Sequence, residues 1–352
     1  MRVAIIASAR HPIREPFAGG LEMHTHALAT GLRERGHEVT VFASGDSDPE
    51  MGVEPVCPTA SGLDLSHAAR TDLSMLSRRF MEEHHAYQHL LLRLPGRDFD
   101  VIQNSSLHYL PVAMAGSLDT PFVTTLHTPP VPWIESAVAA APEPSTITFV
   151  SVSEHNASSW SQVTVREVIP NGIDPRGWPF SASGDPGLAI WTGRIVPEKG
   201  PHLAVEAAHA AGLRIWLAGP ADEGYLEGEV LPRLHPRDAY LGHLTQADLA
   251  EAVGGAGVQL VTPCWDEPFG LVVPEALSCG TPVAAFDRGA MSELLDEECG
   301  RLAPPDDIEA LATAAVEALE LDRRACRRHV EAHFTLDRMV DRYETLYLAS
   351  AR

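Results

Sequence analysis

Cysteine is scarce in this chain of 352 residues, and the few copies follow no metal-binding or disulfide pattern. They are Cys57, Cys264, Cys279, Cys299 and Cys326. Their number is odd and no two of them form a Cys-x-x-Cys pair. The sequence therefore indicates neither a disulfide framework nor a zinc site.

Long apolar runs and an excess of positive charge are also missing. No apolar run approaches the roughly 18 residues that a membrane-spanning helix needs, and the N-terminus enters a strand without a charged leader and apolar signal core. Lys and Arg number 26 against 48 Asp and Glu, so the net charge is −22. This charge disfavours nucleic acid as a partner and offers little to an anionic membrane. We expect a cytoplasmic protein without a nucleic-acid partner and without stable membrane association.

The length and the repeating pattern of elements predict two domains. A chain of this length is long for a single core and suits two domains of about 150 residues each. Apolar strands alternate with amphipathic helices in both halves, which predicts an α/β fold with two doubly wound parallel sheets. A stretch rich in Pro and Gly reads as a linker between them. The predicted division is an N-terminal domain at 1–174, a linker at 175–187, a C-terminal domain at 188–335 and a terminal helix at 336–352.

Polar residues follow the expected strands at their C-terminal ends, where open parallel sheets bind ligands. In the first domain Gly19 and Gly20 stand at a strand-to-helix turn, where a backbone can approach a ligand closely or simply make a tight turn. His127 follows the strand expected at 122–126. These positions are candidate ligand contacts.

Two helical stretches carry clustered charged or titratable residues without a matching motif. The helix expected over 60–94 has His85 and His89 at a spacing that could hold a metal ion. No third ligand stands nearby at a motif spacing, so a face turned to solvent or to an acceptor is the simpler interpretation. The four arginines within 323–328 are interpreted as a solvated helix face.

One stretch, 262–282, combines the features of a nucleotide-sugar site. An apolar strand enters it, and a short helix is expected to open at Phe269 and to end at Gly280. Unpaired N–H groups at a helix start can hold phosphate oxygens. Glu267 and Glu275 frame that start. Two acids around an anion site suit a ligand with phosphate in the middle and hydroxyls at both ends.

Two cations follow the first strand of the second domain. Arg194 can grip a phosphate in bidentate fashion while Lys199 acts as a point charge, a suitable pair for a diphosphate. The alternative is a surface ion pair with Glu198. We predict no metal in the site, because these cations and backbone N–H groups can meet the charge of a leaving diphosphate.

Taken together, these motifs resemble retaining glycosyltransferase family four over essentially the whole chain, in the order and spacing of that family. They are Gly19-Gly20-Leu21-Glu22, His127, Ser151-Val152-Ser153, PNGID at 170–174, Gly193-Arg194 with Lys199-Gly200, Gly242-His243-Leu244 and EPFGLVVPEALSCGTP at 267–282. The resemblance implies a GT-B fold, in which two Rossmann-like domains face each other across a cleft. It also implies a donor site mainly on the C-terminal domain and a last helix that returns to the N-terminal domain.

The resemblance also implies a role for each matched residue. Glu275 would hold the ribose hydroxyls, Glu267 the transferred sugar and Leu244 the base, while His127 would lie near the reacting centre. The implied catalytic residues are His127, Glu267, Arg194 and Lys199, and the implied donor-binding residues are Gly19, Gly20, Arg194, Lys199, Gly219, Leu244, Glu267, Phe269, Gly270, Leu271, Val272 and Glu275. An acid or Gly often follows the matching histidine in the family. Here a proline-rich loop, 128–133, follows it and ends on Trp133, so we expect this loop to shape the acceptor pocket.

We therefore expect a retaining hexosyltransferase that uses a nucleotide diphosphate sugar, with a uridine diphosphate sugar favoured over a guanosine diphosphate sugar. Same-face substitution without a metal ion would move the sugar to an acceptor hydroxyl, on a small metabolite or antibiotic or on a cell-envelope glycan precursor. No cofactor is expected besides this donor substrate. Two alternatives stay open: a membrane-surface transferase with a lipid-linked acceptor, and a sugar phosphorylase on the same scaffold.

Overall fold

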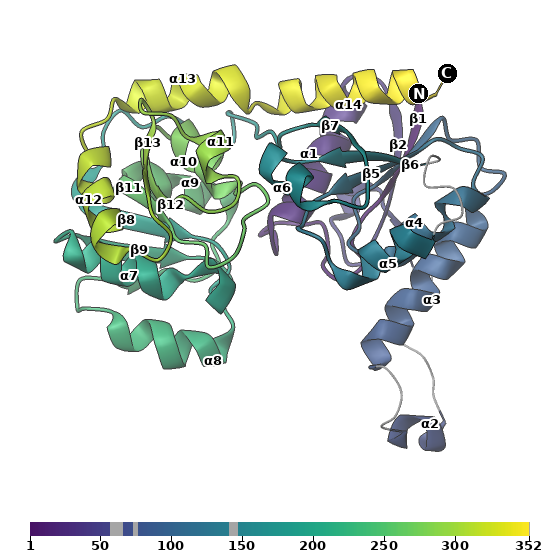
Figure 1. The fold of residues 1–352 in the computed structure, drawn as a ribbon, viewed down its shortest axis with the longest axis horizontal. Coiled ribbons are helices and arrows are strands. Elements are labelled where there is room, and N and C mark those ends of the chain that lie inside the picture. The colour runs from purple at the N-terminus through teal and green to yellow at the C-terminus, as the bar shows by residue number, and fades with distance from the viewer. Residues whose placement is uncertain (57–65, 73–76, 141–146, 352) are drawn as a thin grey trace. The chain divides into compact units, whose positions relative to one another are not determined.

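The computed structural model describes residues 1–56, 66–72, 77–140 and 147–351. The chain divides into two compact units, whose elements are labelled in Figure 1. Unit 1 comprises residues 1–151, 159–167 and 343–352, and unit 2 comprises residues 152–158 and 168–342. Residues 168–174, which the sequence grouped with the first domain, belong to unit 2, because Ile173 bridges to Thr335 and its N–H donates to the carbonyl of Phe334 at 2.9 Å.

Unit 1 is built on a seven-stranded parallel sheet in the order β3-β2-β1-β4-β5-β6-β7. The strands are β1 (Arg2–Ile6), β2 (Glu38–Ala43), β3 (Glu54–Pro55), β4 (Val101–Asn104), β5 (Phe122–Leu126), β6 (Ile147–Ser151) and β7 (Val165–Val168). Strand β1 pairs with β2 on one side and with β4 on the other. The order of connection reverses between β1 and β4, so this is the switch point at which such sheets bind ligands.

The helices of unit 1 follow the predicted alternation with one difference. They are α1 (Gly20–Glu34), α2 (His67–Thr71), α3 (Arg78–Arg93), α4 (Tyr109–Met114) and α5 (Pro132–Ala140). The single helix expected over 60–94 is seen as α2 and α3, because the side chains of Ser66 and Ser77 each cap a new helix start. The rest of that prediction at 57–65 and 73–76, with Cys57, lies outside the described residues.

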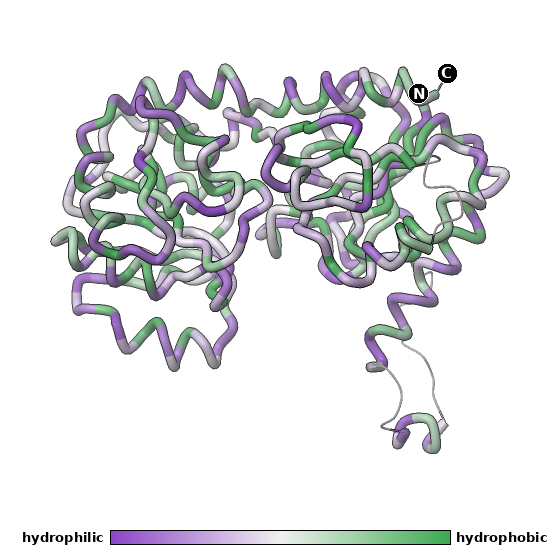
Figure 2. The backbone as a smooth tube through the Cα atoms, in the orientation of Figure 1, coloured by the Kyte–Doolittle hydropathy of each residue, from purple (hydrophilic) through white to green (hydrophobic). Residues whose placement is uncertain are grey.

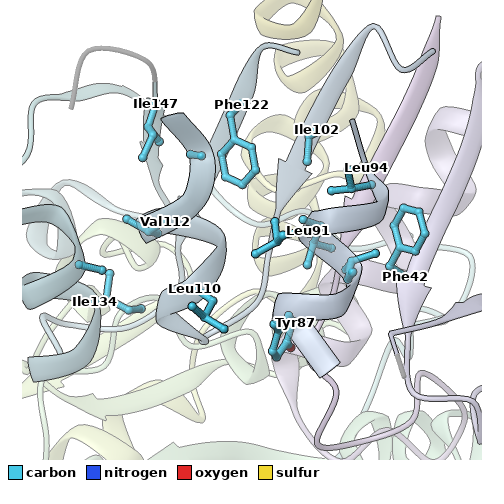
Figure 3. Packing of buried hydrophobic residues seen from close by; sticks show 14 of the residues in the cluster. Phe42, Tyr87, Leu91, Leu94, Ile102, Leu110, Val112, Phe122, Ile134 and Ile147 are labelled. Carbon is cyan, nitrogen blue, oxygen red and sulfur yellow. The ribbon is translucent and has the colours of Figure 1, made fainter. Parts of the chain in front are cut away.

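The core of unit 1 lies between the sheet and the helices α3, α4 and α5. Figure 3 shows Leu91 of α3 and Val112 of α4 among the side chains that pack with Phe122 and other sheet residues. The C-terminal end of the chain also packs in unit 1, because the last part of helix α14 (Leu336–Ser350) belongs to this unit. Its Tyr343 is hydrogen-bonded to Thr125 at 3.0 Å, and its Tyr347 donates to Gln103 at 2.9 Å.

Unit 2 repeats this topology with a six-stranded parallel sheet in the order β10-β9-β8-β11-β12-β13. The strands are β8 (Asp185–Thr192), β9 (Arg214–Ala218), β10 (Ala239–Tyr240), β11 (Ala256–Val261), β12 (Val283–Phe286) and β13 (Gly300–Ala303). The main helices are α6 (Glu154–Ser159), α7 (Pro201–Ala210), α8 (Glu223–Tyr225), α9 (Gln246–Gly255), α10 (Val272–Ser278), α11 (Met291–Leu294), α12 (Ile308–Ala318) and α13 (Arg323–His333). The switch point of this sheet lies between β8 and β11. Both predicted doubly wound sheets are thereby confirmed.

The stretch expected as a linker, 175–187, is packed into unit 2. Trp178 is almost fully buried, and β8 already begins at Asp185. Two arginines of α13 fasten the stretch: Arg323 donates to the carbonyl of Ser181 at 2.9 Å, and Arg327 donates to that of Trp178 at 2.8 Å. The interpretation of the four arginines as one solvated helix face is therefore wrong for Arg323 and Arg327, because their guanidinium N–H groups donate to main-chain carbonyls instead of water.

The hydropathy of the elements follows this architecture. In Figure 2 the strands are mostly hydrophobic, whereas the helices carry both hydrophobic and hydrophilic residues. None of the helices in the described part of the chain has both the length and the apolar character needed to cross a membrane.

Candidate active site

The switch point of unit 2 brings a cation and a carboxylate into direct contact. Lys199 comes from the loop after β8 and Glu267 from the loop after β11, and Lys199 Nζ lies 2.5 Å from Glu267 Oε2. Trp265 completes the group: its Nε1–H donates to the same carboxylate oxygen at 3.0 Å, and the ammonium lies 4.9 Å from the centre of its ring. The pair is mostly buried, which strengthens the attraction relative to an exposed ion pair.

Local backbone contacts explain why the two loops meet. A 3₁₀ turn, Pro197–Lys199, precedes Gly200, which has a φ of +63°. The Thr262 hydroxyl donates to the carbonyl of Gly200 at 2.7 Å, and the Cys264 N–H donates to that of Glu198 at 2.9 Å. A side chain on Gly200 would collide with the carbonyl of Thr262. The close approach of these loops therefore requires glycine at this position.

The backbone around Glu267 is held just as closely. The Ala290 N–H donates to the carbonyl of Glu267 at 2.9 Å, and a Cβ on the preceding Gly289 would collide with the backbone of Glu267. On the other side the Ser153 hydroxyl donates to the carbonyl of Pro268 at 2.6 Å. These contacts fix the direction in which the Glu267 side chain leaves the loop.

Glu275 lies inside α10 and is only 6 % exposed. In the described part of the chain its carboxylate has no hydrogen-bond donor and no ion-pair partner. Burial raises its pKa to about 8, because the charged form loses its hydration. A buried carboxyl without a donor is suited to receive hydroxyls from a ligand.

The start of α10 lies at Val272, three residues later than the sequence predicted. Phe269 is buried and packs edge-on against Phe334 at 6.0 Å, and Gly270 has a φ of +94°, so the chain turns here before the helix begins. The N–H groups of Leu271 and Val272 donate to no main-chain carbonyl among the described residues. They are the free donors expected at a helix start.

Arg194 does not join the group around Lys199 and Glu267. Its side chain is 47 % exposed and lies 3.5 Å from Glu198, which is the surface ion pair considered as the alternative. Exposed pairs of this kind contribute little stability, so the guanidinium can turn towards a ligand at small cost.

The other predicted donor-binding positions of unit 2 lie where its strands end. The Gly193 N–H donates to the carbonyl of Ala218 at 3.0 Å, and the Gly219 N–H donates to that of Gly242 at 2.8 Å. A Cβ on Gly219 would collide with the carbonyl of Gly193. Leu244 follows in a half-buried position just before α9. The ends of these neighbouring strands therefore pack closely at one edge of the sheet, and the close packing requires glycine at position 219.

The remaining predicted residues belong to unit 1. Gly19 is the N-cap of α1 and Gly20 its first residue. His127 follows β5, and its ring meets that of His24 edge-on at 4.7 Å. Burial lowers the pKa of His127 well below its ordinary value, and the neighbouring His24 lowers it further. His127 is therefore a neutral imidazole at physiological pH.

Trp265 and His24 escaped the sequence-based prediction. The position of Trp265 two residues before Glu267 was a usable signal, because alternate residues of an extended segment point to the same side. His24 has no such signal, since its contact with His127 joins positions about a hundred residues apart in the chain.

Two groups in the described part of the chain could hold a metal ion, and neither includes a predicted site residue. The candidate groups are His209 with His235 and Asp238, and Asp296 with Cys299 and His329. In each group one ring nitrogen already contacts a carboxylate, at 2.8 Å and 2.9 Å respectively. An Asp-x-Asp pattern follows β2 at Asp46 and Asp48, and Asp48 caps the next 3₁₀ turn. His85 and His89 are both exposed and belong to neither group.

Comparison with known proteins accounts for both halves of the chain. Residues 18–176 match the family model described as Glycosyltransferase Family 4, and residues 187–321 match the one described as Glycosyl transferases group 1. Glycogen synthase of Mycobacterium tuberculosis (strain H37Rv) is 26 % identical over 100 % of this chain and 95 % of its own. D-inositol 3-phosphate glycosyltransferase of Mycolicibacterium smegmatis is 27 % identical over 94 % of this chain and 86 % of its own.

Solved structures share the fold at lower identity. AviGT4, a glycosyltransferase of avilamycin A biosynthesis, has a TM-score of 0.71 at 20 % identity, over 100 % of this chain and 98 % of its own. HepE of Anabaena, in complex with UDP and glucose, has a TM-score of 0.74 at 18 % identity, over 99 % of this chain and 100 % of its own.

Two Rossmann-like parallel sheets of seven and six strands, with these structural neighbours, are the GT-B fold of glycosyltransferases. The chain belongs to glycosyltransferase family four and is a hexosyltransferase.

Proposed function

We propose that this enzyme moves a hexosyl unit from a nucleotide diphosphate sugar to an acceptor hydroxyl with retention of the anomeric configuration. The observation that carries the proposal is the contact between Lys199 and Glu267 at the switch point of unit 2. It puts a cation suited to a diphosphate beside a carboxylate suited to a sugar hydroxyl. A uridine nucleotide is favoured, a choice supported by the bound UDP of HepE, which shares this fold.

Each part of the donor has a candidate partner. Ribose hydroxyls would donate to Glu275 and relieve the cost of its burial, while Leu244 would lie against the base. The diphosphate would lie between Arg194, Lys199 and the free N–H groups at the start of α10. The donor contacts predicted for Gly19 and Gly20 of unit 1 remain part of the proposal. His127, being neutral, would exchange hydrogen bonds with a sugar hydroxyl instead of acting as a cation.

Same-face substitution fits the state of Glu267. Its Oε2 already accepts hydrogen bonds from Lys199 and Trp265, which suits a carboxylate that holds a hydroxyl better than one that attacks carbon. The bond between the anomeric carbon and the diphosphate oxygen breaks, the acceptor oxygen bonds to that carbon on the same face, and the acceptor proton passes to the departing oxygen. Arg194 and Lys199 stabilise the growing negative charge, so no metal is required.

The first experiment identifies the donor. It needs no known acceptor, because water can accept the sugar and the donor is then hydrolysed. Uridine, guanosine and adenosine diphosphate sugars are incubated with the full chain, with and without EDTA, and nucleotide release is measured. Release from a uridine diphosphate sugar that survives EDTA is expected, and NMR coupling of the first-formed sugar should show retention. Formation of a sugar 1-phosphate from a glycoside and inorganic phosphate, without release of a nucleotide, would instead indicate a phosphorylase.

Arg194→Ala tests the proposed charge stabilisation. Because the charge on the leaving group grows in the transition state, kcat should fall on the order of 100-fold while the donor KM changes little. Arg176→Ala is the control, since Arg176 is another exposed arginine of unit 2 that pairs with a nearby acid. An unchanged kcat with an altered KM would contradict the mechanism.

A further inference from the structure

Three side chains that can ligate a metal ion meet in unit 2 at the amino end of β13. Asp296 and Cys299 come from the turn before this strand, and His329 comes from α13. One ligand atom of each residue lies within 4.8 Å of the ligand atoms of the other two. The loops that carry Lys199 and Glu267 follow the carboxyl ends of β8 and β11, so the three side chains stand at the opposite edge of the same parallel sheet.

The ring of His329 lies between two oxygen atoms. Its Nε2 is 3.0 Å from the carbonyl oxygen of Leu294, and its Nδ1 is 2.9 Å from Asp296 Oδ2. A neutral imidazole carries a single N–H, so in either tautomer one ring nitrogen directs a lone pair at an oxygen. This contact is unfavourable unless a second proton or a metal ion supplies positive charge. The negative charge of Asp296 places that cation on the Nδ1 side of the ring.

Main-chain contacts orient all three side chains. The Glu298 N–H donates to Asp296 Oδ1 at 2.9 Å, which leaves Oδ2 directed at the ring. The Asp296 N–H donates to Cys299 Sγ at 3.4 Å, and this cysteine is fully buried. The carbonyl of Leu294 fixes the ring of His329 from the other side. Metal-ligating histidines usually donate their second ring N–H to a carbonyl or carboxylate in this way, and other ligands have similar outer contacts.

We propose that Asp296, Cys299 and His329 form a zinc site. Thiolate, imidazole and carboxylate are the ligands that Zn²⁺ takes in proteins, whereas Mg²⁺ and Ca²⁺ prefer oxygen ligands alone. The ligand atoms of a tetrahedral zinc site lie about 3.3–3.6 Å apart, so side-chain shifts on the order of 1 Å complete the site. The thiol loses its proton to the solvent when it binds, and water fills the fourth position beside the exposed Asp296.

A proton on both nitrogens of His329 is the competing explanation. It satisfies the contacts of the ring, but it does not account for the thiol of Cys299 beside the same carboxylate. Zinc uses all three groups. No Cys-x-x-Cys pattern marks this site in the sequence, because its histidine follows the cysteine by 30 residues and comes from another element.

The second group of possible ligands, His209 with His235 and Asp238, is less suited to a metal ion. The two imidazole rings are stacked at 3.7 Å and are almost parallel, at 8°. A metal ion must lie close to the plane of each ring that binds it, and two stacked planes share no such point. Asp238 also accepts main-chain N–H groups on both carboxylate oxygens, from Ile215 at 2.8 Å and from His235 at 2.7 Å. This group therefore serves as the comparison in the experiment.

The zinc would connect α13 to the turn before β13 and stabilise unit 2. It would take no part in the transfer proposed above, since it binds at the other edge of the sheet. The inference therefore does not depend on the proposed function, and its test needs no sugar donor. Because zinc binds the native site, it should raise the midpoint of thermal unfolding by about 3 °C or more at 100 times its Kd.

The experiment titrates the full chain with zinc after a chelator and gel filtration have removed bound metal. A fluorescent chelator in competition reports the affinity, and cobalt reports the ligands through the absorption of a cobalt–thiolate bond. One equivalent of zinc should bind, and one equivalent of cobalt should give the thiolate absorption. Absence of tight zinc binding to the stripped wild type would overturn the proposal in favour of a doubly protonated His329.

Variants then locate the site. Cys299→Ser should abolish the cobalt–thiolate absorption and weaken zinc binding at least 100-fold. Asp296→Asn, at an exposed position where folding is not at risk, should weaken it at least tenfold. Glu298→Gln is the matched control, because it removes a charge from the same exposed turn without removing a ligand, and it should bind zinc as the wild type does.

His235→Ala tests the comparison group and should also keep the affinity of the wild type for zinc. Loss of zinc binding in His235→Ala would move the site to that group and overturn the assignment. Wild-type affinity in both Cys299→Ser and Asp296→Asn would overturn it as well. The shift of the thermal midpoint with zinc should follow the same order, present in the wild type and Glu298→Gln and absent in Cys299→Ser.

Discussion

At the scale of single residues, the proposed donor site is a set of side chains whose charges depend on their surroundings. Lys199 and Glu267 compensate each other, and Trp265 touches both. Glu275 is the opposite case, since it is buried without a compensating group in the described part of the chain. In the proposed complex the hydroxyls of a ligand would supply the hydrogen-bond donors that Glu275 lacks.

The two contacts made by Trp265 can be separated by substitution. Trp265→Phe keeps an aromatic ring under Lys199 but removes the hydrogen bond to Glu267, a loss of about 1–2 kcal/mol for a bond to a charged group. We expect kcat to fall about 5- to 30-fold while the affinity for UDP, which lacks the sugar, stays the same. Trp265→Ala should also weaken UDP binding, measured by calorimetry. An unaltered kcat in Trp265→Phe would show that the indole N–H is not needed.

Glu275 predicts a dependence of stability on pH. Its pKa is raised to about 8 in the native state, so between about pH 4.5 and pH 8 the native carboxyl holds a proton that the unfolded chain has released. The free energy of unfolding therefore falls as the pH rises through this window. Glu275→Gln should gain stability relative to the wild type by on the order of 1–3 kcal/mol between pH 5 and pH 8.5.

Denaturant titrations without ligand, repeated across this range of pH, measure that gain. Glu227→Gln, at an exposed position of the π-helix Leu226–Val230, is the control and should show no such trend. A difference between Glu275→Gln and the wild type that stays constant with pH would refute the raised pKa.

At the scale of elements, helix α13 shows that arginines of a basic segment can stabilise packing through hydrogen bonds to the main chain. Its arginines alternate between two environments, because residues four apart share a helix face. Arg323 and Arg327 donate to main-chain carbonyls of unit 2, whereas Arg324 and Arg328 are exposed. The inward pair ties the stretch before β8 to the rest of the unit.

Arg323→Met should destabilise the protein by about 2–4 kcal/mol, because five acceptors would lose a charged donor. These acceptors are the carbonyls of Ser181, Ala256, Gly254 and Cys279 and the hydroxyl of Thr281. Chemical denaturation provides the measurement. Arg328→Met, at an exposed position on the same helix, should cost less than about 0.5 kcal/mol. Equal effects of the two substitutions would mean that the buried hydrogen bonds contribute nothing.

At the scale of the whole molecule, the net charge of −22 governs encounters with other charged surfaces. In buffer of 0.15 M salt the enzyme should stay in the supernatant when it is centrifuged with phosphatidylglycerol vesicles, because the overall field repels an anionic surface. Neutral phosphatidylcholine vesicles are the control. Sedimentation with the anionic vesicles that is lost at high salt would favour the alternative of a lipid-linked acceptor.

The sequence by itself determined the two sheets, and it also supplied most positions of the proposed donor site as predictions. Runs rich in apolar and β-branched residues, such as 122–126 and 283–286, became strands at the predicted residues, because a strand buried on both faces is largely apolar. Lys199, Glu267 and Glu275 were found for a similar reason. Their spacing from strand ends and from a helix start is local and can be read along the chain.

Only the tertiary structure decided which side chains touch. It brought Trp265 and Lys199 onto one oxygen of Glu267, turned Arg323 inward, and placed the ring of His329 against Asp296. Apart from the contact of Trp265 with Glu267, these contacts join residues far apart in the chain. Their partners depend on sheet order and helix packing, which no local pattern of charge or hydropathy records.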